Sequence, residues 1–253
     1  MAAQPVAYQH FAAFYDRVMD DPGPRADRVV AAIRRHRPVA DGAPLHLLEL
    51  GCGTGALLTR LPGTWSATGL DRSPAMLAEA QHSAPGAELV EGDMSDFELD
   101  TRFDVIACVF DSLNHLLSEH RWAATFDRVL AHLGPDGIFV FDVNTTGELE
   151  RLHEDPPFVH EFDEGTAIID VSAAQEADGS MLSHWDIRIF VHTSGHDYRL
   201  VRETISEFAV PWRTLAPLIE RRFDLLEATD ESGGPPSDDA VKIHVVARRP
   251  GRS

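Results

Sequence analysis

The chain has 253 residues, of which 43% are hydrophobic and 25% are charged. This composition fits one large globular domain, or one domain with a sizeable insert, and excludes a disordered chain. Its formal net charge of −19 disfavours nucleic acid as a partner, and its single lysine, Lys242, argues against lysine-based covalent catalysis.

The two cysteines, Cys52 and Cys108, lie in or beside apolar runs. This pattern indicates reduced, buried thiols and no disulfide framework. Residues 1–10 lack the basic and apolar regions of a signal peptide, and no apolar run approaches the ~18 residues needed to span a membrane. We therefore expect a soluble, cytoplasmic protein without a membrane partner, and we leave a homodimer open.

Helices and strands are predicted to alternate through the first 144 residues. In chain order they are the helices Ala7–Asp20 and Arg25–His36, the strand Pro44–Leu50, the helix Ala56–Leu61, the strand Ala67–Leu70, a helix beginning near Pro74, the strands Ala87–Glu91 and Phe103–Phe110, the helix Glu119–Leu133, and the strand Ile138–Val143. Such alternation predicts an α/β fold with a doubly wound, mostly parallel sheet, whose ligand crevice lies at the carboxyl ends of the strands.

The pattern changes after Asn144. Three segments, Ile168–Ser172, Ser183–Val191 and Tyr198–Ala209, read as strands separated by short polar turns and predict an antiparallel insert. A helix at Trp212–Arg222 and strands at Phe223–Thr229 and Val241–Ala247 would then return the chain to the main sheet.

A glycine cluster follows the first strand. Gly51, Gly53 and Gly55 allow a tight turn and let a ligand approach the main chain closely. Asp71 follows the next strand about 20 residues later, a separation at which an acidic side chain can bind ribose hydroxyls. Together these features predict a nucleoside-type ligand.

Dinucleotide binding is the rival interpretation, because Gly51, Gly53 and Ala56 also fit the looser dinucleotide pattern. The segment Glu91-Gly92-Asp93-Met94, at the end of the third strand, favours a different cofactor. Its carboxylate can accept a hydrogen bond from an adenine amino group, and its backbone amide can donate to a ring nitrogen.

These motifs, in this order, resemble the class I S-adenosylmethionine-dependent methyltransferases over most of residues 8–144. The resemblance is carried by Glu49-Leu50-Gly51-Cys52-Gly53-Thr54-Gly55, Gly69-Leu70-Asp71-Arg72-Ser73-Pro74-Ala75-Met76-Leu77, Glu91-Gly92-Asp93-Met94, Phe103-Asp104-Val105-Ile106, and Gly137-Ile138-Phe139-Val140-Phe141-Asp142-Val143-Asn144. It implies a Rossmann-like, seven-stranded sheet whose last strand is antiparallel, with S-adenosylmethionine as the cofactor.

The resemblance also implies roles for individual residues. In such enzymes the acid in the place of Asp71 holds the ribose, Met76 would pack on the adenine, and Asp93 with Met94 would frame its polar edge. The cofactor-binding residues implied in this chain are Tyr15, Glu49, Gly51, Cys52, Gly53, Asp71, Arg72, Met76, Asp93, Met94, Cys108 and Val109.

Two further segments are similar to small-molecule methyltransferases, including the amino-sugar N-methyltransferases of antibiotic pathways: Phe11-Ala12-Ala13-Phe14-Tyr15-Asp16 and Cys108-Val109-Phe110-Asp111-Ser112-Leu113-Asn114-His115-Leu116. In that group the N-terminal helix closes over the cofactor with its tyrosine, a histidine matching His115 lies near the acceptor, and the antiparallel insert covers the acceptor side. Tyr15 and His115 are therefore the candidate catalytic residues.

Each of these two residues also has a structural interpretation. A neutral imidazole at His115 could take the acceptor's proton or orient the acceptor, and the alternative is a hydrogen bond to a loop carbonyl. The apolar stripe around Tyr15 would occur in any helix that packs on a core. No metal is expected, because His192 and His196 flank a hairpin turn without a third ligand at a usual spacing.

The leading hypothesis is an enzyme that moves a methyl group from S-adenosylmethionine to a nitrogen or oxygen of a small-molecule metabolite, in specialised metabolism. The alternatives are a binding protein of the same fold without transfer activity and an RNA methyltransferase, which the charge disfavours. We expect four units: an N-terminal helical cap at 1–40, a cofactor-binding core at 41–150, an acceptor-side insert at 151–210, and a C-terminal part of the core at 211–253.

Overall fold

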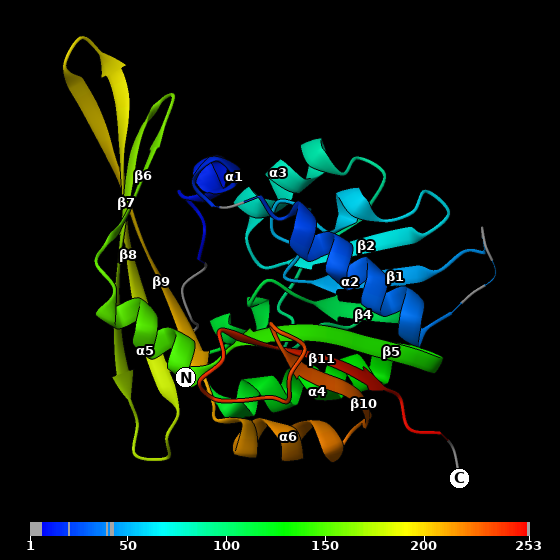
Figure 1. The fold of residues 1–253 in the computed structure, drawn as a ribbon. Coiled ribbons are helices and arrows are strands. Elements are labelled where there is room, and N and C mark those ends of the chain that lie inside the picture. Colours follow the sequence, from blue (N-terminus) through cyan, green and yellow to red (C-terminus); the bar gives the residue numbers. More distant parts are fainter. Residues whose placement is uncertain (1–6, 20, 39, 41–42, 252–253) are drawn as a thin grey trace.

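The structure is a computed structural model that describes residues 7–19, 21–38, 40 and 43–251. Within these residues the chain forms a main sheet with helices on both faces and a second, taller sheet that stands beside it (Figure 1). Three boundaries of the expected units, residues 1, 41 and 253, lie outside the described residues.

The main sheet has seven strands in the order β10-β11-β5-β4-β1-β2-β3. They are β1 (His46–Leu50), β2 (Ser66–Asp71), β3 (Glu88–Glu91), β4 (Phe103–Cys108), β5 (Leu133–Asn144), β10 (Asp224–Asp230) and β11 (Lys242–Arg248). Strands β1 to β5 pair in parallel, and β11 is antiparallel to both of its neighbours. The predicted α/β fold with an antiparallel last strand is thus confirmed.

Residues of β4 show why the sheet is buried on both faces. Val105 and Ala107 point to one face, where α2 (Gly23–His36) packs, and Ile106 and Cys108 point to the other, where α4 (Glu119–His132) and α6 (Trp212–Glu220) pack. All four side chains are buried. Successive side chains of a strand point to opposite faces of the sheet. Because helices cover both faces here, residues 105–108 of β4 are all apolar, which gives the continuous apolar run seen in the sequence.

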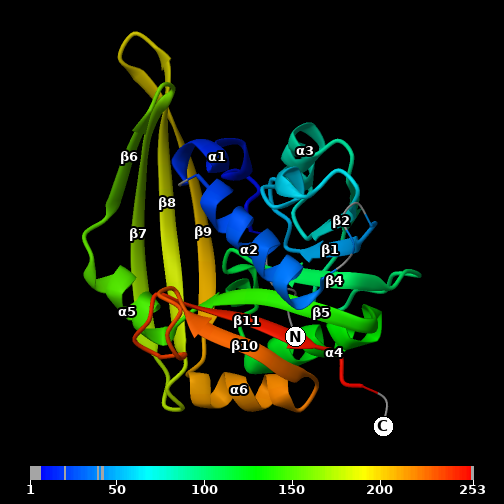
Figure 2. The same cartoon turned by 45° about the vertical axis from the view of Figure 1, so that its right-hand side comes forward.

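The insert is an antiparallel sheet of β6 (Phe158–Phe162), β7 (Gly165–Gln175), β8 (Met181–Ser194) and β9 (Asp197–Ala209), paired in chain order. A single turn η1 (Ala12–Phe14) and the short helix α1 (Tyr15–Val18) lie beside it (Figure 2). Phe11, Phe14 and Val18 pack into an apolar cluster with inward residues of β7, β8 and β9. The insert is therefore joined to the N-terminal segment as well as to the main sheet.

The expected N-terminal helix is shorter than the sequence suggested. Regular helix is confined to residues 12–18, and Asp20, the expected end, lies outside the described residues. Tyr8 has a φ of 63°, and the amides of the next three residues donate to the Glu203 carboxylate instead of entering a helix. The apolar spacing is real, but it serves packing on the insert.

Two other boundaries were wrong. The helix expected at Ala56–Leu61 is only a turn, η2 (Leu58–Arg60), because the residue before Pro62 is extended. β5 begins at Leu133 rather than Ile138, because the segment expected as a turn is a bulge in the strand, with a register shift against β4.

Two elements were missed. Helix α3 (Pro74–Ser83) was expected, but α5 (Thr146–Glu154) was not, although the Thr145 side chain accepts from the Glu148 amide in a capping pattern that is visible in the sequence. Strand β6 follows two prolines and is an edge strand with Phe158 half exposed, so its sequence lacks a buried-strand pattern.

Candidate active site

A cavity opens at the carboxyl ends of β1, β2 and β3, beneath the N-terminal segment. Ten of the residues expected in the site line it: Tyr15, Gly51, Cys52, Gly53, Asp71, Arg72, Met76, Asp93, Met94 and His115. The sequence motifs therefore converge on one space, at the edge of the sheet where ligands of doubly wound folds bind.

The glycine turn forms the wall after β1. Gly51 and Gly53 have φ values of 69° and 53°, a left-handed conformation that other residues adopt at a cost. A Cβ at Gly51 would lie 2.7 Å from the Ser112 Cβ, whereas a Cβ at Gly53 would meet nothing within 4 Å. Gly51 is thus required by close packing, and Gly53 leaves the turn open above the main chain.

Asp71, at the end of β2, is held by the main chain. One carboxylate oxygen accepts from the Gly53 amide at 2.9 Å, and the other accepts from the Ser73 amide at 2.8 Å. Burial raises the pKa of Asp71 above its usual value, against the opposing effect of these amides. The backbone of Arg72 also donates to this carboxylate and lowers its pKa. A carboxylate offers about four lone-pair sites, so one remains for a further donor.

Asp93 lies after β3 with both oxygens engaged. It accepts from the amide and the hydroxyl of Ser95, at 2.9 and 2.7 Å, and forms an ion pair with Arg121 from α4. Partial burial acts to raise the pKa of Asp93, but the hydrogen bonds from Arg121 and Ser95 outweigh it and hold the pKa below its usual value. Arg121 itself lines the cavity, so this end presents a carboxylate and a guanidinium together.

His115 lies on the turn η3 (Ser112–His115), and its two ring nitrogens have different partners. Nδ1 is 3.2 Å from the Ser206 carbonyl oxygen, and Nε2 is 3.0 Å from the Tyr8 hydroxyl. A carbonyl can only accept, so in the neutral ring Nδ1 carries the hydrogen and Nε2 accepts from Tyr8. Burial lowers the pKa of His115 below 6.5, despite the opposing charge of Asp111.

The N-terminal segment closes the cavity with two tyrosines. The Tyr8 ring meets Tyr15 and His115 edge to face, with centroids 5.7 and 5.4 Å apart. Asp16, next to Tyr15, accepts from the Thr54 hydroxyl of the glycine turn at 2.8 Å. Tyr8 thus contacts the histidine.

Three expected residues do not line this cavity. Glu49, Cys108 and Val109 are at most 1% exposed. Cys108 lies behind Met94, with its sulfur 3.9 Å from the Met94 sulfur, and burial raises the pKa of its thiol. Burial also raises the pKa of Glu49, whose Oε2 has no hydrogen-bond partner among the described residues.

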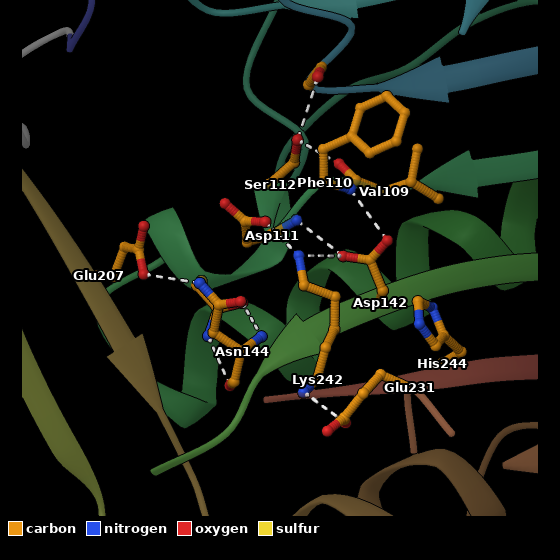
Figure 3. A network of polar contacts seen from close by, with 12 residues as sticks. Val109, Phe110, Asp111, Ser112, Asp142, Asn144, Glu207, Glu231, Lys242 and His244 are labelled. Atoms are coloured by element: carbon orange, nitrogen blue, oxygen red, sulfur yellow. Dashed lines mark hydrogen bonds and ion pairs between the residues drawn. The ribbon is translucent and has the colours of Figure 1, made fainter. Parts of the chain in front are cut away.

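A buried polar network fixes the loop after β4, as Figure 3 shows. Phe110 and Asp111 both have positive φ, near 58°. Their amides donate to the two oxygens of Asp142 at 3.0 and 2.8 Å, and Lys242 bridges Asp111 and Asp142. Burial acts to lower the pKa of Lys242, but the two carboxylates outweigh it and raise it.

The cavity also has lining residues that sequence reasoning missed, among them Tyr8, Thr54, Ser73, Ser112 and Arg121. Ser73 had a signal, because a serine before Pro74 is a typical helix N-cap, and its hydroxyl accepts from the Met76 amide at 3.3 Å. Tyr8 had none, since its partner His115 lies 107 residues away in the sequence.

Among the described residues, no helix is long and apolar enough to cross a membrane, and no group of three or more metal-ligating side chains is arranged to hold an ion.

Comparison with known proteins gives the family. Residues 47–137 match the family described as methyltransferase domain. The chain is 38% identical over 136 residues to the dTDP-3-amino-3,6-dideoxy-alpha-D-glucopyranose N,N-dimethyltransferase of Streptomyces fradiae, and it spans about half of that relative, 52% of each chain.

Two other relatives are matched over nearly their full length. An S-adenosylmethionine-dependent methyltransferase of Clostridium acetobutylicum has the same fold, with a TM-score of 0.79 and 24% identity over 96% of this chain and 99% of that one. The putative methyltransferase YqeM of Bacillus subtilis is 30% identical over 249 residues, 96% of this chain and 97% of the relative. The chain therefore belongs to the class I S-adenosylmethionine-dependent methyltransferases.

Proposed function

We propose that this protein transfers the methyl group of S-adenosylmethionine to an amine nitrogen of a small molecule. The observation that carries the proposal is the state of His115. Its Nδ1 hydrogen faces a carbonyl, so Nε2 carries the lone pair and accepts from Tyr8, which lines the cavity with His115.

The cavity fits the methyl donor on two grounds. The main chain is open above Gly53, where a Cβ would meet no atom within 4 Å. Asp71 keeps a lone pair for a ribose hydroxyl, and Asp93 with Arg121 supplies polar partners about the adenine. Met76 is buried in the wall, where it can pack on the base.

The donor, when bound, supplies a methyl group on a sulfonium that is already activated for displacement. The chain then has to hold the acceptor nitrogen in line with that methyl and exclude water. Tyr8 and Tyr15 close the cavity and provide the exclusion, and the insert supports them because it packs against the same N-terminal segment. We assign Tyr15 to closure of the cavity.

We assign proton removal to His115. A lowered pKa keeps its ring neutral at physiological pH, and Nε2 is the nitrogen that can accept. The acceptor would have to displace the Tyr8 hydroxyl, which now occupies the hydrogen-bonding position of an amine. Tyr8 is therefore assigned to guarding the acceptor position.

The acceptor class that we propose is an amino sugar or a similar small amine. The Streptomyces fradiae relative is named for such a substrate, and the net charge of −19 opposes an RNA acceptor. We assign residues 158–209 to the acceptor-side cover, because β9 supplies both the carbonyl that orients His115 and the carboxylate that holds the N-terminal segment.

The test is product formation. The protein is incubated with methyl-labelled S-adenosylmethionine and a panel of amino sugars, nucleotide-linked amino sugars and simple amines, and labelled product is followed by mass spectrometry. We expect methylation of at least one amine at nitrogen. Binding of S-adenosylhomocysteine without methylation of any panel member would favour a binding protein. Tighter binding of NAD than of S-adenosylhomocysteine would overturn the assignment of the cofactor.

A further inference from the structure

A second cavity lies on the other side of Phe110, between α2 and the face of β5, β11 and β10. We call it the α2 cavity. Its volume is about 730 Å³, within the range of small-molecule sites. Val109 and residues 140–142 belong to segments that carry the family resemblance, but no residue that lines the active-site cavity also lines this one. The proposed reaction therefore leaves the α2 cavity without a role.

Cations face this cavity from one helix. Arg25, Arg28 and Arg35 all come from α2 and line it. Arg35 pairs with Glu227 at 3.0 Å. Among the described residues, however, no carboxylate lies within ion-pair distance of Arg25 or Arg28. The Arg28 guanidinium lies 3.5 Å from the Glu231 carbonyl oxygen and 3.5 Å from His244 Nε2, and the Arg25 guanidinium lies over the Phe110 ring.

The carboxylates that line the cavity already have donors. Glu227 accepts from Arg35 and from His36, and Glu231 accepts from the amides of Val241 and Lys242. Asp230 and Asp142 accept from loop amides in the same way. The acids of the lining keep their charge, but their oxygens already accept hydrogen bonds. Among the described residues, Arg25 and Arg28 are therefore the guanidinium groups of this cavity that have no carboxylate within ion-pair distance.

The floor of the cavity is apolar. Val29, Ala32, Val140 and Val246 line it below the arginines. A space with an apolar floor and two guanidinium groups at its rim suits an amphipathic anion, because a guanidinium binds phosphate and carboxylate oxygens in a fork geometry.

The cavity adjoins the candidate active site through one residue. Phe110 lines the active-site cavity, and its ring lies 5.1 Å from the Arg25 guanidinium carbon on the α2 side. The positive φ of Phe110 is maintained by Asp142 beneath it, which also pairs with Lys242 at the base of the α2 cavity (Figure 3). A ligand on Arg25 would thus lie one side chain from the reaction.

We propose that the α2 cavity binds a small organic anion through Arg25 and Arg28, at a site separate from the methyl donor. The anionic group is a phosphate or a carboxylate, and it comes either from a remote part of the acceptor or from an independent effector. The proposal does not depend on which amine is methylated.

The test is calorimetric titration of pyrophosphate, with citrate as a second probe, into protein saturated with S-adenosylhomocysteine. We expect saturable binding to the unaltered protein. The double variant Arg25→Gln with Arg28→Gln should weaken it at least about tenfold, since each hydrogen bond to a charged partner is strong. The matched control is Arg34→Gln, which removes the same charge from α2 outside the cavity lining.

The proposal is overturned if neither probe binds saturably, if Arg34→Gln weakens binding as much as the double variant, or if Arg72→Gln abolishes it while the double variant does not, because Arg72 lines the active-site cavity instead. Inhibition kinetics then distinguish the two possible sources of the anion. Inhibition by pyrophosphate that is competitive with the acceptor indicates the acceptor's own anionic group, and inhibition independent of acceptor concentration indicates an effector.

Discussion

The two walls of the active-site cavity are built in different ways. The wall on the side of the glycine turn joins residues close in sequence: Gly53 and Asp71 are 18 positions apart, and the Gly53 amide donates to the Asp71 carboxylate. The wall formed with the N-terminal segment joins Tyr8 to His115 across 107 positions, and the Ser206 carbonyl, which lies outside the lining, contacts His115 across 91. The difference teaches that the donor side is specified locally, whereas the acceptor side depends on how the N-terminal segment and the insert dock.

The largest effect is expected on the acceptor side, at its candidate base. His115→Ala should lower turnover by roughly 10²–10⁴ while S-adenosylhomocysteine affinity stays nearly constant. Because burial lowers the His115 pKa, the acidic limb of the turnover profile should fall below pH 6.5 and vanish in the variant. Tyr8→Phe is the control. It removes the hydroxyl but leaves the imidazole, so the acidic limb should remain in this variant. An acidic limb that persists in His115→Ala would reassign the base.

A second effect on the same side concerns Glu207 in β9. Burial, together with the charge of Asp111, raises its pKa to about 8, against an ordinary value of 4.5. The folded state therefore keeps a proton that the unfolded state has lost, and stability should fall as the pH rises from about 4.5 to about 8.

Glu207→Gln should remove this dependence, because glutamine carries no charge at any pH. The variant should be more stable than the unaltered protein by up to roughly 4 kcal/mol at pH 9, and the two should differ little at pH 4. Urea denaturation across this range measures it. Asn144, which donates to Glu207 at 3.1 Å, should retain an acceptor in the variant. Parallel stability curves for the two proteins would show that Glu207 is already ionised in the folded state.

On the donor side the expected effect is on affinity. Asp71→Ala should weaken S-adenosylhomocysteine binding about tenfold to a hundredfold, because hydrogen bonds to a charged acceptor contribute about 1.5–3 kcal/mol. Asp71→Asn retains one acceptor oxygen and should lose less. Calorimetry decides the matter, and an affinity unchanged by the alanine substitution would remove Asp71 from the site.

The smallest effect is expected where the insert holds the N-terminal segment, outside the cavity lining. Glu203→Ala removes the carboxylate that accepts from the amides of Gln9, His10 and Phe11, and should make local opening there easier by about 1 kcal/mol. Amide hydrogen exchange at these residues measures it. The control is Glu164→Ala, which removes an exposed ion pair with Arg17 and should change exchange less. Equal protection in Glu203→Ala would mean that apolar packing alone holds the segment.

The same contrast explains what could be predicted from the sequence. The sheet, the glycine turn and Asp71 were predictable, because strand periodicity and turn chemistry act over a few residues. The contacts of Tyr8 and of Arg121 were not, because they arise only when α4 and the N-terminal segment reach the cavity from distant parts of the chain. The family resemblance implied Cys108 and Val109 in the site, but strand alternation and the turn after β4 bury them.

Lys242 gives the chain a chemical property that its charge balance does not reveal. It is the only side-chain amine, it is 9% exposed, and two carboxylates hold it in the protonated form, which is not nucleophilic. Reagents that acylate amines should therefore spare this position in the native protein. Acylation of Lys242 would report the rate at which β11 leaves the sheet, from a single labelled atom.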